Sequence, residues 1–104
     1  MRLDLDQLRA LASQKKIIWK RHALERMLES GLSRAIVLQV IANSELIEDY
    51  SEDRPSPSGL LLGWDGNRPV HVVATLEEDV LAIITVHEST TEYFEPDFRT
   101  RRKV

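Results

Sequence analysis

The sequence predicts a single α+β domain in which two or three N-terminal helices pack on an antiparallel sheet of three to four strands. Two observations lead to this fold class. Apolar residues recur at helical spacing in the first part of the chain, and they alternate with polar residues in the second part. The change of period separates a helical half from a sheet half. At 104 residues, the chain has room for one core, so we expect one domain over residues 1–104.

The N-terminal segment predicts a short amphipathic helix over residues 3–14, with Asp4 or Asp6 as its N-cap. We treat residues 1–18 as a helical extension of the domain. The apolar run that follows, residues 16–20, fits either a short strand or an extended lead-in to the next helix, because so short a run does not separate the two.

A second helix is predicted over residues 22–30 and ends at Gly31, which suits the left-handed conformation that closes many helices. A third helix is predicted over residues 34–42, with Ser33 as its N-cap, and its nearly continuous apolar surface indicates a buried helix. The core-facing stripe of the second helix is expected to comprise Ala23, Leu24, Met27 and Leu28.

The remaining elements are strands, predicted over residues 45–50, 60–64, 69–76 and 80–87. A proline-rich loop over residues 51–58 follows the first of them. The tetrapeptide Asp-Gly-Asn-Arg after residue 64 is typical of a tight hairpin turn.

The register of the last hairpin decides which polar side chains meet. If residues 77–79 form a three-residue turn, His71 lies opposite Thr85, and His87 lies diagonally beside it on the same face. A slip of one residue would change this arrangement.

Composition excludes several classes of protein. The chain has no cysteine, which rules out disulfides and thiolate chemistry and fits a cytoplasmic location. It has no apolar run approaching the ~18 residues of a transmembrane helix, and its first residues do not follow the order of a signal peptide. A net charge of −3 gives no general attraction to nucleic acid.

The charged residues are clustered. Basic residues gather around the start of the second helix and in a tail over residues 95–104, and an acidic block lies between them over residues 45–53. These clusters are either solvated faces or a local anion-binding surface. The basic positions that could contact phosphate are Lys20, Arg21, Arg99, Arg101 and Arg102.

The second helix carries the most suggestive polar face. His22, Arg26 and Glu29 fall together on its outward side, where an imidazole one turn before a guanidinium could transfer protons beside a bound phosphate. The alternative is that both are exposed and that Arg26 pairs with Glu29 or Glu25. His71, in the middle of a strand, could equally be a half-buried residue bonded to nearby backbone or to Thr85.

The three histidines do not predict a metal site. Their spacing contains no pair typical of metal ligands, and no cysteine completes a tetrahedral set. The sequence therefore predicts no cofactor.

Several blocks of sequence match a known pattern: W-x-x-HALERM-L-E-x-G-L-S, ELIEDY-x-E-D-R-P-x-P-S, R-P-V-HVV and ITV-x-E. On these blocks the chain resembles the DUF4258 family of small, uncharacterised bacterial proteins, from Trp19 to about Arg102. The segment from His87 to Thr91 departs from the family, which usually has an aromatic residue and a turn like E-P-D-P there.

The family looks related to the RelE/ParE-like superfamily and, in its order of helices and strands, to BrnT-type toxins. This resemblance implies a RelE/BrnT-like fold, a type II toxin–antitoxin module, metal-independent RNA cleavage and an antitoxin-like protein partner. The positions that carry over as catalytic candidates are His22, Arg26, His71 and Thr85. The alternative is a non-catalytic interaction module, or a homodimer, with a toxin-like fold.

Overall fold

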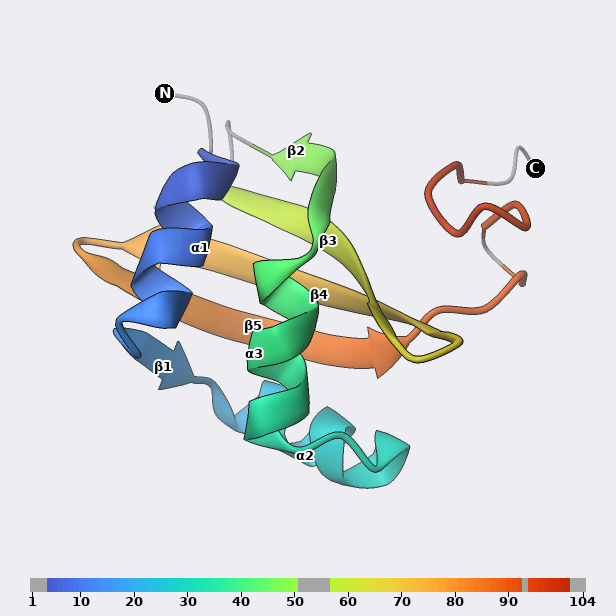
Figure 1. Ribbon diagram of the computed structural model, residues 1–104, viewed down its shortest axis with the longest axis horizontal. Helices are drawn as coiled ribbons and strands as arrows, with labels where there is room; N and C mark the ends of the chain where they lie inside the picture. The colour runs from blue at the N-terminus through green and yellow to red at the C-terminus, as the bar shows by residue number, and fades with distance from the viewer. Residues whose placement is uncertain (1–3, 51–56, 93, 102–104) are drawn as a thin grey trace.

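The computed structural model describes residues 4–50, 57–92 and 94–101. Within these residues the chain forms three helices and five strands, shown in Figure 1. In chain order they are α1 (Leu5–Ser13), β1 (Ile17–Trp19), α2 (Arg21–Ser30), α3 (Arg34–Ala42), β2 (Glu45–Tyr50), β3 (Ser58–Asp65), β4 (Arg68–Glu77) and β5 (Val80–Glu88).

The strands form one mixed sheet in the order β1-β5-β4-β3-β2. β1 runs parallel to β5, and the other neighbours are antiparallel. The α+β class is confirmed, but the expectation of three to four purely antiparallel strands is wrong. The additional strand is β1, which has only three residues and extends the sheet by pairing with β5. This pairing decides the open question about residues 16–20 in favour of a strand.

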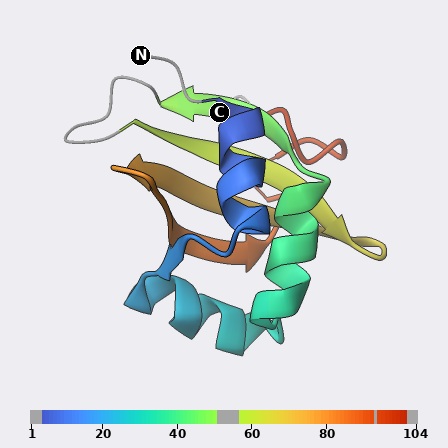
Figure 2. The same ribbon diagram turned by 60° about the vertical axis from the view of Figure 1, so that its left-hand side comes forward.

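All three helices lie on one side of the sheet, as Figures 1 and 2 show, and the main core lies between them and β3, β4 and β5. Leu28 departs from the predicted stripe of α2, because its side chain is 85% exposed. The fully buried side chains of the core include Leu8, Val37, Ile41, Leu61, Val70, Val72, Leu81, Ile83 and Val86.

The predicted helix ends are confirmed. Asp4 Oδ1 accepts a hydrogen bond from the Asp6 backbone N–H at 2.9 Å, which makes Asp4 the N-cap of α1. Ser33 Oγ accepts one from the Ile36 backbone N–H at 3.1 Å and caps α3. Gly31 ends α2 with a φ of 67° in the left-handed region.

The β3–β4 hairpin has the predicted turn, with Asp65 paired to Arg68 and Gly66 at a φ of 61°. The register predicted for the β4–β5 hairpin is wrong. Its turn has two residues, since Glu77 pairs directly with Val80.

A bulge in the same hairpin adds a further shift. Ala74 pairs with Ile83 but Val73 pairs with Thr85, so Ile84 is the extra residue on β5. Beyond this bulge, His71 lies directly opposite His87, and Thr85 faces Val73 instead.

The position of α2 follows from the shortness of β1. β1 pairs with β5 only from Leu81 to Ile83, and the chain then turns at Lys20, whose backbone N–H donates to the Ile83 carbonyl at 3.1 Å. α2 packs against β5, so a helix rather than a strand neighbours the last part of β5 (Figure 1). This arrangement brings a side chain of α2 close to His87.

Residues 94–101, called the C-terminal loop below, lie on the face of the sheet away from the helices. Phe94 and Arg101 form an isolated antiparallel bridge that closes the loop. The predicted proline-rich loop falls mostly outside the described residues. In the part of the chain that the structure describes, no helix is long and apolar enough to cross a membrane.

Gly63 of β3 provides a test of how closely α3 packs on the sheet. A Cβ atom at this position would lie 2.5 Å from both the Cγ1 atom and the carbonyl oxygen of Val40. We expect Gly63→Ala to lower the free energy of unfolding by about 1–3 kcal/mol, measured by urea titration, because the backbone of α3 must move away. Gly66→Asn is the control and should change stability little, because its site is open and asparagine tolerates positive φ. Equal stability of both variants would contradict the close packing.

Candidate functional site

Two histidines on neighbouring strands form the centre of the candidate site. The rings of His71 on β4 and His87 on β5 lie edge to face, with their centroids 5.7 Å apart. The Phe94 ring lies 4.5 Å from the His71 ring, measured between centroids. His71 is only 1% exposed, whereas His87 is half-buried.

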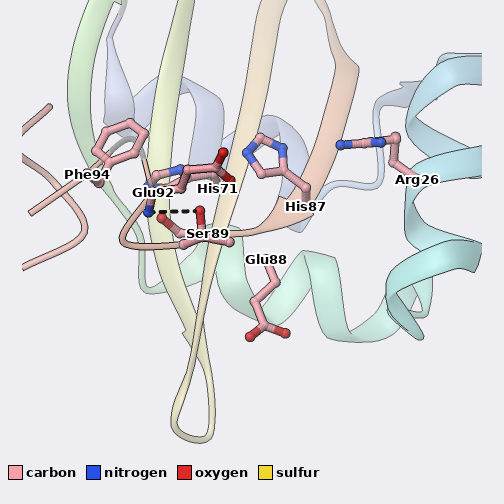
Figure 3. Close-up of a pocket in the computed structure, with 8 residues that line it drawn as sticks. Arg26, His71, His87, Glu88, Ser89, Glu92 and Phe94 are labelled. Carbon is pink, nitrogen blue, oxygen red and sulfur yellow. Dashed lines mark hydrogen bonds between the residues drawn. The ribbon is translucent and has the colours of Figure 1, made fainter. Parts of the chain in front are cut away.

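A cavity of about 220 Å³ adjoins this pair (Figure 3). Arg26 extends from α2 toward His87 in this view, and the segment after β5 supplies the opposite wall. The cavity therefore combines imidazole, guanidinium, carboxylate and hydroxyl groups. Its lining residues are Arg26, His71, His87, Glu88, Ser89, Thr90, Glu92 and Phe94.

His71 is held in one orientation by the C-terminal loop. Its Nε2 atom lies 2.7 Å from the Phe98 carbonyl oxygen, so Nε2 carries a proton and donates it to that oxygen. Burial lowers the pKa of His71 from its ordinary value of 6.5, although the bond to the Phe98 carbonyl acts in the opposite direction. At neutral pH the imidazole is therefore uncharged, with Nδ1 as its acceptor.

His87 is also uncharged at neutral pH. Burial lowers its pKa below 6.5, repulsion from His71 acts in the same direction once His71 is protonated at lower pH, and the positive charge of Arg26 lowers the pKa further. A bound anion beside Arg26 would offset this effect and raise the pKa again. His87 is thus a group whose protonation depends on what occupies the cavity.

Ser89 contributes a polar group that lacks a partner. The residue is 5% exposed, and within the described residues its Oγ atom has no hydrogen-bond partner. Because a buried hydroxyl without a partner costs free energy, the atom is available to a group bound in the cavity. Nearby, the Glu92 backbone N–H donates to Thr90 Oγ1 at 3.3 Å, which bends the segment around the cavity.

Of the four catalytic candidates from sequence, the structure brings together Arg26 and His71. His22 is exposed on α2 and is not among the residues that line the cavity. Thr85 shares the face of His71 but lies opposite Val73, two pairs further along the strands, and it does not line the cavity either. Both departures follow from local geometry: α2 presents Arg26 rather than His22 to β5, and the bulge shifts the register.

The candidate phosphate-binding cations are mostly paired with carboxylates of the same chain. Lys20 Nζ lies 3.0 Å from Glu77 Oε1, and Arg21 Nε lies 4.0 Å from Glu25 Oε2. Arg99 bonds Glu45, and Arg101 Nε lies 2.6 Å from Glu48 Oε2. Arg102 lies outside the described residues.

Sequence reasoning missed the importance of His87, Ser89 and Glu92. His87 was placed only diagonally to His71, because the bulge at Ile84 has no glycine or proline to indicate it. Ser89 and Glu92 follow the last strand in a segment with no motif. The one sequence signal for this part of the site was an acidic residue, Glu92, a few residues after a strand that ends with His87 and Glu88.

The chain matches one family model, described as "Domain of unknown function (DUF4258)", over residues 19–88. The protein belongs to this family. The matched residues are about two thirds of the chain, and they include Arg26, His71 and His87. No curated protein and no solved structure matches the chain. The DUF4258 match ends at the last residue of β5, so the far wall of the cavity and the C-terminal loop follow the matched region.

The two neutral histidines predict a stability that depends on pH. Because their pKa values are lower in the folded chain than in the unfolded chain, the unfolded state binds more protons below about pH 6.5. The free energy of unfolding should therefore be constant above this pH and fall as the pH decreases through 6.5 toward 5, measured by urea titration. In the double variant His71→Gln/His87→Gln this decrease should be smaller. If the free energy of unfolding decreases equally in the double variant, titrating groups other than these two histidines cause the decrease.

Proposed function

We propose that this DUF4258 protein is a metal-independent endoribonuclease of the toxin type, with its active site at the His71–His87 cavity. The observation that supports this proposal is that a guanidinium, an imidazole and a carboxylate, those of Arg26, His87 and Glu92, line one small cavity. The four antiparallel strands that follow α3 also agree with the RelE/BrnT-like fold that the resemblance implies, whereas the parallel strand β1 was not expected.

Cleavage of RNA without a metal requires three groups. A base removes the proton from the 2′-hydroxyl, an acid protonates the leaving 5′-oxygen, and a cation stabilises the charge that develops on the phosphorus oxygens. The 2′-oxygen attacks phosphorus as the bond to the 5′-oxygen breaks, which gives a 2′,3′-cyclic phosphate and a free 5′-hydroxyl. The two proton transfers balance, since one proton is taken and one is given.

The cavity suggests one assignment of these roles. Glu92 acts as the base, because its carboxylate can accept a proton and lines the same cavity as His87 and Arg26. His87 acts as the acid once a bound phosphate raises its pKa, and Arg26 supplies the cation. The unpartnered hydroxyl of Ser89 donates to a phosphate oxygen.

His71 has a positioning role in this mechanism. Its Nε2–H is already bonded to the Phe98 carbonyl, and it is almost inaccessible to solvent. Its ring lies against that of His87 at an interplanar angle of 89°, and so limits the orientations of the His87 imidazole.

The proposal is tested with purified protein and a short single-stranded RNA. We expect His87→Ala and Glu92→Gln each to reduce kcat/KM by about 10²–10⁴-fold, the range for loss of an acid or base. His22→Ala is the matched control, because this exposed histidine lies away from the cavity and should leave the rate unchanged. If expression of the unmodified protein arrests growth, His87→Ala and Glu92→Gln should abolish the arrest, and His22→Ala should preserve it.

The pH dependence gives a second readout. His87 must be protonated to act as the acid, and its pKa in the free protein is lowered from 6.5. Because kcat/KM reports the free protein, it should fall as the pH rises through this lowered pKa, below pH 6.5, and His87→Ala should remove the decrease. Intact RNA with the unmodified protein, together with normal growth of expressing cells, would refute the ribonuclease function.

A non-catalytic protein-interaction module is the second candidate, and two observations favour it. The cations expected to bind RNA are mostly paired within the chain, as described above. Leu28 on α2 is 85% exposed, and Ile18 on the edge strand β1 is 43% exposed. Exposed apolar side chains of this size are common at protein interfaces, either with an antitoxin-like partner or with a second copy of the chain.

Light scattering after size-exclusion chromatography distinguishes the modes of association. If Leu28 lies in a homodimer interface, the unmodified protein should have twice the mass of one chain, and Leu28→Ser should shift it toward the monomer. The control is Leu28→Met, which keeps the apolar contact and should remain dimeric. Leu24→Ser would not serve as a control, because Leu24 packs against the core. A monomeric protein that copurifies with no other chain would contradict an interaction module.

A further inference from the structure

The C-terminal loop is a closed unit with its own hydrogen bonds. The Glu95 backbone N–H donates to the Thr100 carbonyl at 2.7 Å, and the Phe98 N–H donates to the Glu95 carbonyl at 2.8 Å. The Asp97 carboxylate accepts from the backbone N–H groups of Arg99 and Thr100, both at 3.0 Å. These bonds lie within the loop and hold its turn together.

Two arginines attach this loop to β2. Arg101 binds Glu48 through two bonds, from Nε to Oε2 at 2.6 Å and from Nη2 to Oε1 at 3.0 Å. Arg99 bonds Glu45, which lies three residues before Glu48 on β2. The side chains of Arg101 and Arg99 are 56% and 51% exposed, so both ion pairs are open to water on one side.

The same loop covers His71. The Phe98 carbonyl accepts the His71 Nε2–H, and the Phe94 ring packs against the imidazole. Phe98 also contacts Trp64 edge to face, with the ring centroids 5.9 Å apart. Because His71 lies on the face of the sheet away from the helices, it is the loop that closes this face over the imidazole.

Two hollows on this face share Phe94 of the loop as a wall. The cavity of about 220 Å³ beside Arg26 and a second hollow of about 230 Å³ beside Tyr50 are both lined by His71, His87 and Phe94. Of these three residues, only Phe94 belongs to the loop. Movement of the loop would therefore join the two hollows into one groove along β4 and β5.

The loop can leave without disturbing the main core. That core is built from α1, α2, α3 and strands β3 to β5, and it contains no described residue of the C-terminal loop. The Arg99–Glu45 pair is about half exposed and is screened by salt, so it contributes little to the attachment. The Arg101–Glu48 pair is the stronger anchor, because it has two bonds and the Glu48 side chain is only 19% exposed. Release of the loop therefore depends mainly on breaking the Arg101–Glu48 pair.

We propose that the C-terminal loop is a displaceable cover, which shields His71 and splits one groove into two hollows until its arginine anchors release Glu45 and Glu48. The proposal concerns only access to His71, so it does not depend on whether the protein cleaves RNA. Any ligand that binds the Nε2 atom of His71 must first displace the Phe98 carbonyl.

Chemical modification of histidine tests the cover in the full chain. Diethyl pyrocarbonate is applied at pH 7.5, where His71 and His87 are uncharged, and the modification of each histidine is followed by mass spectrometry. In the double variant Glu45→Gln/Glu48→Gln, we expect His71 to react about five to ten times faster than in the unmodified protein. The reason is that both ion pairs that attach the loop to β2 are lost. Exposed His22 is the internal reference and should react at an unchanged rate.

The matched control is Glu78→Gln/Asp79→Asn, which removes the same charge from the exposed β4–β5 turn and should leave His71 protected. Amide hydrogen exchange shows whether the fold persists: the Glu95 and Phe98 amides should exchange faster, and those of β3 and β4 should stay protected. The unmodified protein in 1 M NaCl should show the same change without any substitution.

An unchanged His71 rate in both the variant and high salt, with β3 and β4 still protected, would overturn the proposal and make the loop a fixed part of the fold. Loss of protection in β3 and β4 together with the loop would overturn it as well, because the cover would then not be separable from the domain.

Discussion

The site depends on one extra residue in β5. From the turn to Ile83, partners on β4 and β5 follow the register set by a two-residue turn, and Leu81 and Ile83 face the helices. If that register continued, His71 would lie opposite Val86 and His87 would point into the helix-covered core. The bulge at Ile84 shifts the pairing by one residue, so Val86 enters the core and His87 joins His71 on the open face. Both the apolar core and the histidine pair require the bulge.

Charge pairing within the chain determines which cations remain for function. The acidic strand β2 and the basic C-terminal loop neutralise each other through Glu45, Glu48 and their arginine partners. Burial acts to raise the pKa of Glu48, but hydrogen bonds from Arg101 and Tyr50 outweigh it and leave the pKa below its ordinary value. Arg26 differs, because within the described residues its ion pair is a long one, with Glu29 at 3.9 Å, and its side chain extends toward His87. Arg26 is therefore the cation that the structure places beside the histidines.

The sequence predicted those elements whose signals are local. Ser33, Gly31 and the turn at Gly66 act through bonds or dihedral angles of their own neighbours, and the structure confirms each. The pairing of β1 with β5 could not be predicted, because a three-residue strand is defined by a partner more than sixty residues away. Glu78 takes a φ of 58° in a turn without glycine or asparagine, so the turn length had no sequence signal. The exposure of Leu28 depends on where α2 meets the edge of β5, which helical periodicity alone does not specify.

The site was only partly predictable for the same reason. Arg26 and His71 were candidates on residue type, and they meet because α2 replaces β1 beside the last part of β5. The family match contains these two residues and His87 but ends at Glu88, whereas Ser89, Glu92 and the loop that covers His71 follow it. The matched domain thus supplies the imidazoles and the guanidinium on a rigid sheet and helix. The segment after it supplies Ser89, Glu92 and the loop over His71, so the two sides of the cavity come from different parts of the chain.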